Sequence, residues 1–197
     1  MTAKLYNLFF INLLETLLDY DRSLFYFLNA VFTNPVFDAV MPFVTDKANF
    51  LEIILLSWFA IFTLTGVKGR KTALILLVIV LISDQTTNLL KELFHRIRPC
   101  TALSDVRLLV GCGDSYSFPS NHATNIFATM LYLSYKYRML SPLFIAIALT
   151  VAYSRVYVGV HYPLDITGGA VLGAGISFVA VTAERKLLPE QKMRGTD

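Results

Sequence analysis

Residues 154–165 read SRVYVGVHYPLD and separate two long apolar runs. The second run opens at Pro163, because proline is well suited to the first position of a helix. We therefore expect His161 just outside a helix start. Asp165 would lie in the first turn, where its carboxylate accepts a hydrogen bond from His161 Nδ1 and leaves Nε2 free as a base or nucleophile. Arg155 adds a permanent cation suited to phosphate. Taken alone, the stretch fits equally well a loop histidine between tyrosines and an acidic residue favoured by the helix dipole.

The composition places the chain in the membrane class. Its 197 residues are 55% hydrophobic and only 16% charged, and the mean hydropathy is +0.58. One domain is enough for this length, and residues 1–20 lack the small residues expected at a signal-peptide cleavage site. The formal net charge of +3 comes from dispersed lysines and arginines, so nucleic acid is not an expected partner.

Several apolar segments are long enough to cross a bilayer, which takes about 20 residues or slightly fewer. They are residues 49–66, 71–93, 121–137, 141–157 and 163–184. The links with clustered cations are predicted to be cytoplasmic by the positive-inside rule; these cations are Lys68, Arg70, Lys71, Lys136, Arg138, Arg185, Lys186, Lys192 and Arg194. Alternation then places residues 94–120 and 158–162 together on the opposite, exoplasmic face.

The first 48 residues are interrupted by charges and by prolines, and they are dense in aromatic side chains. This pattern suits amphipathic helices lying along the membrane surface, and we favour five spans over six. The predicted fold is therefore an all-α integral membrane protein, a bundle of five or six transmembrane helices. Its parts are N-terminal interfacial helices in 1–48, a transmembrane core in 49–184 and a cytoplasmic tail in 185–197.

The segment 91–99 reads KELFHRIRP and ends one predicted span. Lys91 and Arg98 are seven residues apart, hence on one helical face, and Pro99 should end the helix at about Arg98. Both cations would project from the exoplasmic end of the span. Snorkelling to the headgroups is the ordinary alternative, and it fits His95 and Arg96 better than the other two.

The segment 118–122 reads FPSNH and stands immediately before the next span. Ser120 is a plausible N-cap, and the amides of Asn121 and His122 at a helix start would form an anion site. His122 could donate a proton to the group that carries the anion. Ordinary helix-start chemistry explains everything here except the histidine.

Together the three segments supply the parts needed for phosphoryl transfer without a metal ion. Positioning and charge neutralisation do most of the work in such reactions, while one histidine attacks and another protonates the leaving oxygen. The cations are Lys91, Arg98 and Arg155, the donors are Ser120 and two amides, and the remaining groups are His122, His161 and Asp165.

The three segments resemble the signature motifs of the type 2 phosphatidic acid phosphatase superfamily, which are shared with the vanadium haloperoxidases. Residues 91–99 match K-x6-R-P, residues 119–122 match P-S-G-H except at one position, and residues 154–165 match S-R-x5-H-x3-D. The resemblance covers roughly residues 49–184. The one departure is Asn121, where the family usually has glycine. Asparagine tolerates positive φ better than other non-glycine residues, so the turn can survive, although its side chain adds bulk beside the phosphate.

The resemblance implies a role for each matched residue. His161 would be the nucleophile that forms a phosphohistidine, Asp165 would orient it, and His122 would be the general acid. The phosphate would be bound by Lys91, Arg98, Ser120, Asn121 and Arg155. No cofactor and no metal ion are expected. A haloperoxidase does not fit the membrane character of the chain.

The expected function is hydrolysis of a lipid phosphate at the exoplasmic face of a bacterial inner membrane. The candidate substrates are lipid A 1-phosphate, undecaprenyl pyrophosphate, phosphatidylglycerol phosphate and phosphatidate, and we favour the first two. A lipid phosphotransferase, in which a lipid hydroxyl replaces water, is the alternative. A channel that uses Asp84 and Lys91 would leave both histidine motifs unexplained. We also expect a disulfide between Cys100 and Cys112, because both lie in one loop that faces an oxidising compartment; a pair of free thiols is the alternative.

Overall fold

The computed structural model describes residues 2–187, and every regular element in that range is a helix. The N-terminal part comprises α1 (Thr2–Tyr26), a π-helical turn (Phe27–Val31), α2 (Pro35–Thr45) and a 3-10 turn (Lys47–Phe50). The bundle comprises α3 (Leu51–Leu64), α4 (Gly66–Phe94), the short α5 (Pro99–Ala102), α6 (Asn121–Lys136), a 3-10 turn (Arg138–Leu140), α7 (Ser141–Tyr157) and α8 (Pro163–Leu187). The predicted all-α bundle is confirmed.

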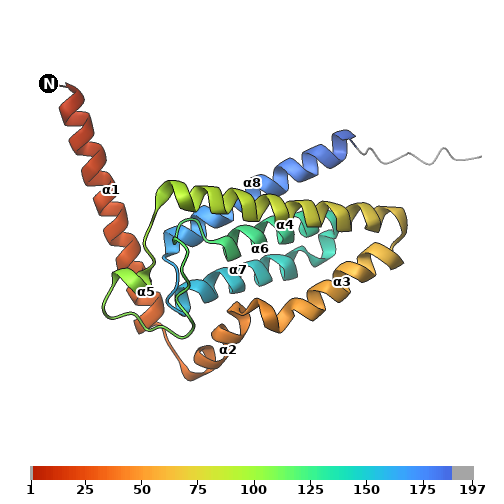
Figure 1. Cartoon of the computed structure of the whole chain (residues 1–197), viewed down its shortest axis with the longest axis horizontal. Coiled ribbons are helices and arrows are strands. Elements are labelled where there is room, and N and C mark those ends of the chain that lie inside the picture. The colour runs from red at the N-terminus through yellow and green to blue at the C-terminus, as the bar shows by residue number, and fades with distance from the viewer. Residues whose placement is uncertain (1, 188–197) are drawn as a thin grey trace, which may run out of the picture.

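Helix α6 is the centre of the bundle and packs against α4, α7 and α8 (Figure 1). Two glycines let α8 approach it closely. A Cβ atom at Gly169 would lie 2.7 Å from the Ser120 carbonyl oxygen, and one at Gly173 would lie 2.4 Å from that of Thr124. Small residues at such contacts bring helix backbones together within membranes. The close approach sets the first turn of α8 beside the start of α6.

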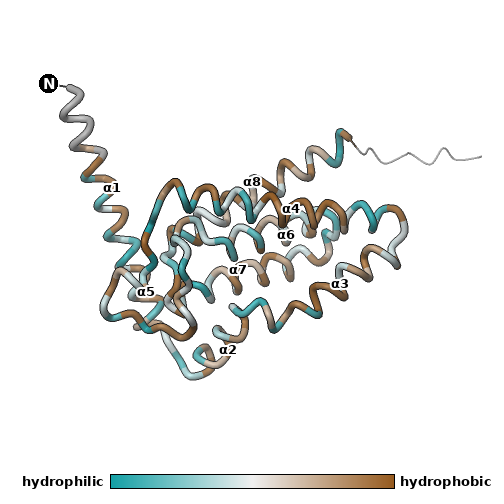
Figure 2. Tube along the Cα trace, in the orientation of Figure 1, coloured by the Kyte–Doolittle hydropathy of each residue, from teal (hydrophilic) through white to brown (hydrophobic). Residues whose placement is uncertain are grey.

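The outer surface of the bundle is apolar. Helix α3 has no buried residue, and large side chains of α4, α7 and α8 are also exposed. Figure 2 shows the hydrophobic residues along α3 and the middle of α4. An exposed apolar surface of this extent is expected of a protein surrounded by lipid.

Four helical segments within the described residues are long and apolar enough to cross a membrane, and the N-terminal pair would give a fifth. That pair, Ile11–Val31 and Pro35–Thr45, is bent by 115°. Helix α6, where a span over 121–137 was predicted, is not one of these segments. It has 16 residues, so it is about 24 Å long, and it packs against α4, α7 and α8. The interfacial placement of residues 1–48 remains a prediction.

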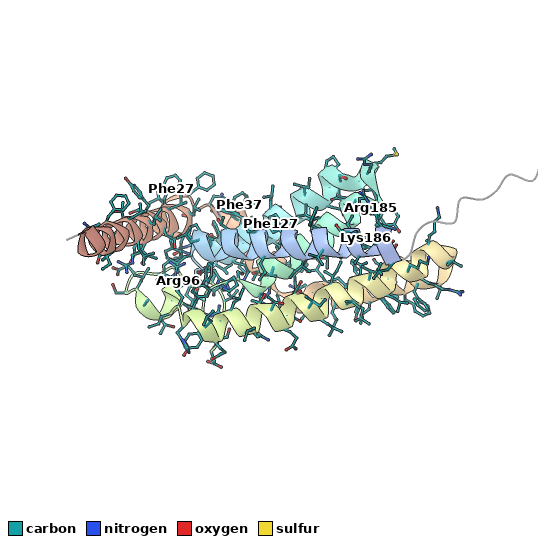
Figure 3. The ribbon with its side chains drawn as sticks, turned by 90° about the horizontal axis from the view of Figure 1, so that it is seen from above. Phe27, Phe37, Arg96, Phe127, Arg185 and Lys186 are labelled. Carbon is teal, nitrogen blue, oxygen red and sulfur yellow. A yellow bond between two sulfur atoms is a disulfide. The ribbon has the colours of Figure 1, made fainter. Side chains whose placement is uncertain are left out.

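The two classes of link lie at opposite ends of the bundle. The basic links that follow α3 and α6 lie at one end with the end of α8, and residues 95–120 and 158–162 lie at the other (Figure 1). Figure 3 shows Arg96 near one end and Arg185 and Lys186 near the other. The predicted cytoplasmic tail begins with these two residues, but its remainder, 188–197 with Lys192 and Arg194, is outside the described residues.

The predicted disulfide is confirmed by the pairing of Cys100 with Cys112, whose Cα atoms are 6.0 Å apart. It closes part of the long loop between α4 and α6. We expect replacement of both cysteines by serine to lower the free energy of unfolding by about 3 kcal/mol, as for other loops of this size. We also expect no alkylatable thiol before reductant is added. Two alkylated thiols in the unreduced intact protein, measured by mass, would contradict the pairing.

Candidate active site

His161 lies in the turn between α7 and α8 and is only 1% exposed. Its Nδ1 atom is 3.4 Å from Asp165 Oδ2, and its Nε2 atom is 3.4 Å from an Arg98 guanidinium nitrogen. Gly159 makes the turn possible, since its φ is +89° and a Cβ there would lie 2.8 Å from the Arg107 carbonyl oxygen. One ring nitrogen therefore faces a carboxylate, and the other faces a cation.

Burial also sets the protonation state of His161. It lowers the pKa of the ring to about 4, the hydrogen bond to Asp165 opposes that shift, and the nearby Arg155 and Arg98 add to it. A lowered histidine pKa means that the ring stays neutral until the pH falls to about 4. At neutral pH, Nε2 therefore has a free lone pair.

Asp165 is fully buried in the first turn of α8, as predicted. Its Oδ2 atom accepts hydrogen bonds from the Tyr162 amide at 2.9 Å and from Ser117 Oγ at 2.5 Å, in addition to facing His161. Its Oδ1 atom accepts from Arg96 at 2.6 Å. The carboxylate is thus held by donors from three parts of the chain: the turn before α8, the Ser117 loop and Arg96.

The prediction for Arg96 is wrong: its side chain is only 19% exposed and does not extend to the headgroups. Its two terminal nitrogens bridge Asp165, at 2.6 Å, and Asp21 of α1, at 2.5 Å. The cause is the end of α4. His95 adopts a left-handed conformation with φ 47°, which turns the chain so that Arg96 joins the site.

The same turn corrects the predicted end of this helix, which is Phe94 and not Arg98. Arg98 has an extended conformation before Pro99, so Lys91 and Arg98 do not share a helical face. Both side chains instead contact Ser115 and Tyr116, in the loop before α6, which the sequence did not identify as part of the site. Arg98 donates to the Ser115 carbonyl oxygen at 2.7 Å and to its Oγ at 2.9 Å, and Lys91 donates to the Tyr116 carbonyl oxygen.

Ser120 stands at the N-cap position of α6, but its side chain makes no capping bond. Its Oγ atom is buried and has no partner, while its amide donates to the Asp165 carbonyl oxygen at 3.0 Å. Among the described residues other than glycine, only His95 has positive φ. Asn121 therefore needs no left-handed turn, and its side chain accepts from Asn125 at 2.9 Å.

Arg155, in the last turn of α7, donates to Thr45 Oγ1 at 2.6 Å, and its Nε atom is buried without a partner. A cavity of about 510 Å³ lies beside it, and His122 and Lys47 also line this cavity. A second cavity of about 310 Å³ adjoins Arg98 and Ser115. Unpartnered buried polar atoms are uncommon, and those of Ser120 and Arg155 are suited to the oxygens of an anion.

The structure thus gathers the three motifs at one end of the bundle, and it adds groups that sequence reasoning missed. Those groups are Asp21, Thr45, Arg96, Ser115 and Ser117. Of these groups, only Asp21 could have been found from the sequence, because an ionisable residue within an apolar segment usually has a buried partner. In the described residues, no three His, Cys, Asp or Glu side chains form a metal-ligand group.

Comparison with known proteins gives a consistent result. A model of the PAP2 superfamily matches residues 72–188. A lipid A 4'-phosphatase of Bacteroides thetaiotaomicron is 30% identical over 82% of this chain and 75% of its own length. An undecaprenyl-diphosphatase of Sulfolobus acidocaldarius is 36% identical, but over only 59% of this chain and 57% of that protein.

The fold also has solved counterparts. A transmembrane PAP2-type phosphatidylglycerolphosphate phosphatase from Bacillus subtilis superposes with a TM-score of 0.72 at 24% identity, covering 89% of this chain and 90% of that one. LpxE from Aquifex aeolicus gives a TM-score of 0.70 at 24% identity, covering 81% and 93%. The match of the family model over more than half of the sequence, with the three motifs gathered in one site, shows that this chain belongs to the PAP2 superfamily.

Proposed function

We propose that the chain is an integral membrane lipid phosphatase that works through a phosphohistidine at His161. The observation that carries the proposal is the setting of this ring, whose Nδ1 faces Asp165 and whose Nε2 faces Arg98. Relatives that are named as phosphatases of lipid A and of undecaprenyl diphosphate support a lipid phosphate as substrate. The apolar outer surface supports a substrate that arrives from the bilayer.

In the first step, His161 Nε2 attacks phosphorus, and the bond between phosphorus and the lipid oxygen breaks. His122, which we propose is protonated once the anionic substrate is bound beside it, donates its proton to that oxygen, so the lipid leaves as a neutral hydroxyl or as a protonated phosphate. Lys91, Arg98 and Arg155 neutralise the phosphoryl oxygens, together with the free hydroxyl of Ser120. Asp165 accepts a hydrogen bond from the His161 Nδ1–H group, which keeps its proton while the ring is phosphorylated.

In the second step, His122 removes a proton from water, and the water oxygen attacks the phosphohistidine. The bond between phosphorus and Nε2 breaks, inorganic phosphate leaves, and His161 regains its lone pair. A lipid hydroxyl in place of water would make the enzyme a phosphotransferase. The charge neutralisation in both steps comes from side chains of this chain, so we propose a reaction that needs no metal ion.

We also propose that the site faces the exoplasmic side of a bacterial inner membrane. The basic links at the other end of the bundle favour a cytoplasmic position for that end. The disulfide in the loop beside the site is typical of an oxidising compartment. The two observations agree on the orientation.

Lys47 bears on the choice of substrate. It lines the cavity of about 510 Å³ together with His122 and Arg155, which is the side where the leaving group must receive its proton. No ion-pair partner of Lys47 is found among the described side chains, and the neighbouring Asp46 already accepts from the Ala48 amide at 3.0 Å. A cation here would stabilise an anionic leaving group, so we propose a preference for lipid diphosphates.

The test is phosphate release by the purified protein from two substrates with the same prenyl chain, a monophosphate and a diphosphate. We expect Lys47→Ala to lower kcat/KM for the diphosphate by about tenfold or more, the value of one charge-assisted hydrogen bond, and to leave the monophosphate nearly unchanged. Lys186→Ala is the matched control, because Lys186 lies at the end of α8 far from the site.

Three outcomes would count against parts of this proposal. Equal losses on both substrates would remove Lys47 from leaving-group recognition. Phosphate release that requires an added acceptor lipid would indicate a phosphotransferase. Release from neither substrate, nor from lipid A 1-phosphate, phosphatidate or phosphatidylglycerol phosphate, would contradict the lipid phosphatase itself.

A further inference from the structure

Arg96 joins two buried carboxylates that are far apart in the sequence. Its terminal nitrogens contact Asp165 at 2.6 Å and Asp21 at 2.5 Å. Asp21 is 3% exposed and Asp165 is fully buried. We call this group the Asp21–Arg96–Asp165 bridge. It brings a residue of α1, outside the matched family region of 72–188, to within one side chain of the residue that faces His161.

The bridge is fixed by further contacts at its Asp21 end. The other oxygen of Asp21 accepts a hydrogen bond from the Leu164 amide at 2.8 Å, at the start of α8. The Arg96 guanidinium lies 4.1 Å from the centre of the Tyr162 ring, and this ring packs against Phe25 of α1 at 5.5 Å. The last turns of α1 are therefore attached to the same turn that carries His161.

The charges of the bridge matter for the chemistry of His161. A phosphorylated imidazole that keeps its Nδ1 proton carries a positive charge on the ring, and Arg98 and Arg155 already face that ring. Asp165 must offset these charges. Arg96 alone would cancel the charge of Asp165, whereas the bridge of two carboxylates and one guanidinium has a net charge of −1. A buried carboxylate and guanidinium interact strongly because little water screens them.

We propose that Asp21 and Arg96 are positioning residues that orient Asp165 and keep the Nδ1 side of His161 negative, so that α1 forms part of the catalytic unit. The proposal rests on the phosphohistidine mechanism above. The charged and polar groups around the bridge and the ring include the cations Lys91, Arg98 and Arg155 and the neutral groups Tyr162 and Ser117. Ser117 is uncharged, so the remaining negative charge comes from the two aspartates.

The test compares the inhibition constants of vanadate and of phosphate. Vanadate takes the five-coordinate geometry of the transferring phosphoryl group when it bonds to a histidine, whereas phosphate binds as the product. We expect Asp21→Asn, which keeps the shape and removes the charge, to weaken vanadate by about ten- to a hundredfold, to lower kcat by a similar factor and to leave the phosphate constant and KM nearly unchanged. A misfolded fraction would lower the measured activity, but it would not change the ratio of the vanadate inhibition constant to the phosphate inhibition constant.

Two variants complete the test. Asp19→Asn, an exposed carboxylate on α1 that pairs with Arg22 at 3.3 Å, is the matched control and should behave as the unmodified protein. The double variant Asp21→Asn with Arg96→Met restores the net charge of −1 of the bridge, because Asp165 is then the only charged member of it. We expect it to recover part of the vanadate affinity that Asp21→Asn loses.

The proposal is overturned if Asp21→Asn keeps the original ratio of the two constants, or if the double variant is at least as impaired as the single one. If Asp21→Asn cannot be purified folded, Asp21→Ser replaces it, because it removes the same charge and keeps an oxygen that can accept from the Leu164 amide. The ratio should then change as for Asp21→Asn, and an unchanged ratio would overturn the proposal. An unmodified protein that hydrolyses no lipid phosphate would reject the proposed function instead, so the two failures are distinguishable.

Discussion

Replacing His161 with alanine is expected to abolish both phosphate release and any acid-labile phosphoenzyme. The ring supplies the atom that bonds to phosphorus. The Ser117 hydroxyl, from the loop between α4 and α6, also contacts Asp165, but it already donates to that carboxylate. Loss of the nucleophile removes the pathway and not merely a part of the rate. The measurement is phosphate release together with acid-quenched phosphoenzyme, on any lipid phosphate that the unmodified protein hydrolyses.

His95 gives the matched control for this experiment. It is an exposed histidine that follows α4, 4.0 Å from Glu92. Asparagine tolerates the left-handed conformation at this position, so His95→Asn should retain full activity. A His161→Ala variant that is folded and still forms a phosphoenzyme would show that another residue is the nucleophile.

Replacing His122 with alanine should have the second-largest effect, but one that depends on the leaving group. Loss of a general acid typically lowers rates by about 10²- to 10⁴-fold, so we expect that loss on lipid phosphates, whose alkoxide leaves poorly. An activated aryl phosphate needs no proton, and its hydrolysis should remain measurable. The His122 side chain lines the cavity beside Arg155, which is consistent with access to the leaving oxygen.

The two histidine variants are best measured side by side on the same two substrates. Slow but measurable turnover of the aryl phosphate by His122→Ala, and none by His161→Ala, is the expected pattern. Equal and complete loss on both substrates would contradict the separate roles of the two residues.

Much of the fold could be predicted because its signals are local. Pro163 opens α8 and places Asp165 in the first turn, as the sequence indicates. The basic links sort the loops to two ends of the bundle, and that sorting, with both cysteines in one loop, led to the predicted pairing of Cys100 with Cys112. Such features depend on neighbouring residues and on the membrane, both of which are visible in the sequence.

The errors arose where contacts over long sequence distances decide the structure. The spacing of Lys91 and Arg98 suggested one helical face, but His95 ends the helix early and a loop serine joins the two cations instead. Arg96 was assigned to the lipid headgroups because its partner, Asp21, is 75 residues away. A single sequence contains no signal for that pairing except the cost of leaving a carboxylate unpaired in an apolar segment.

The most direct test of the account is to locate the phosphoryl group during turnover in the absence of metal ions. Purified protein, treated exhaustively with EDTA, is mixed with a lipid phosphate, quenched under conditions that preserve phosphohistidine, and digested for mass spectrometry. We expect continued phosphate release and a phosphoryl group on His161. Activity that vanishes with EDTA and returns only with a divalent metal ion, or a phosphoryl group on any other residue, would contradict the account.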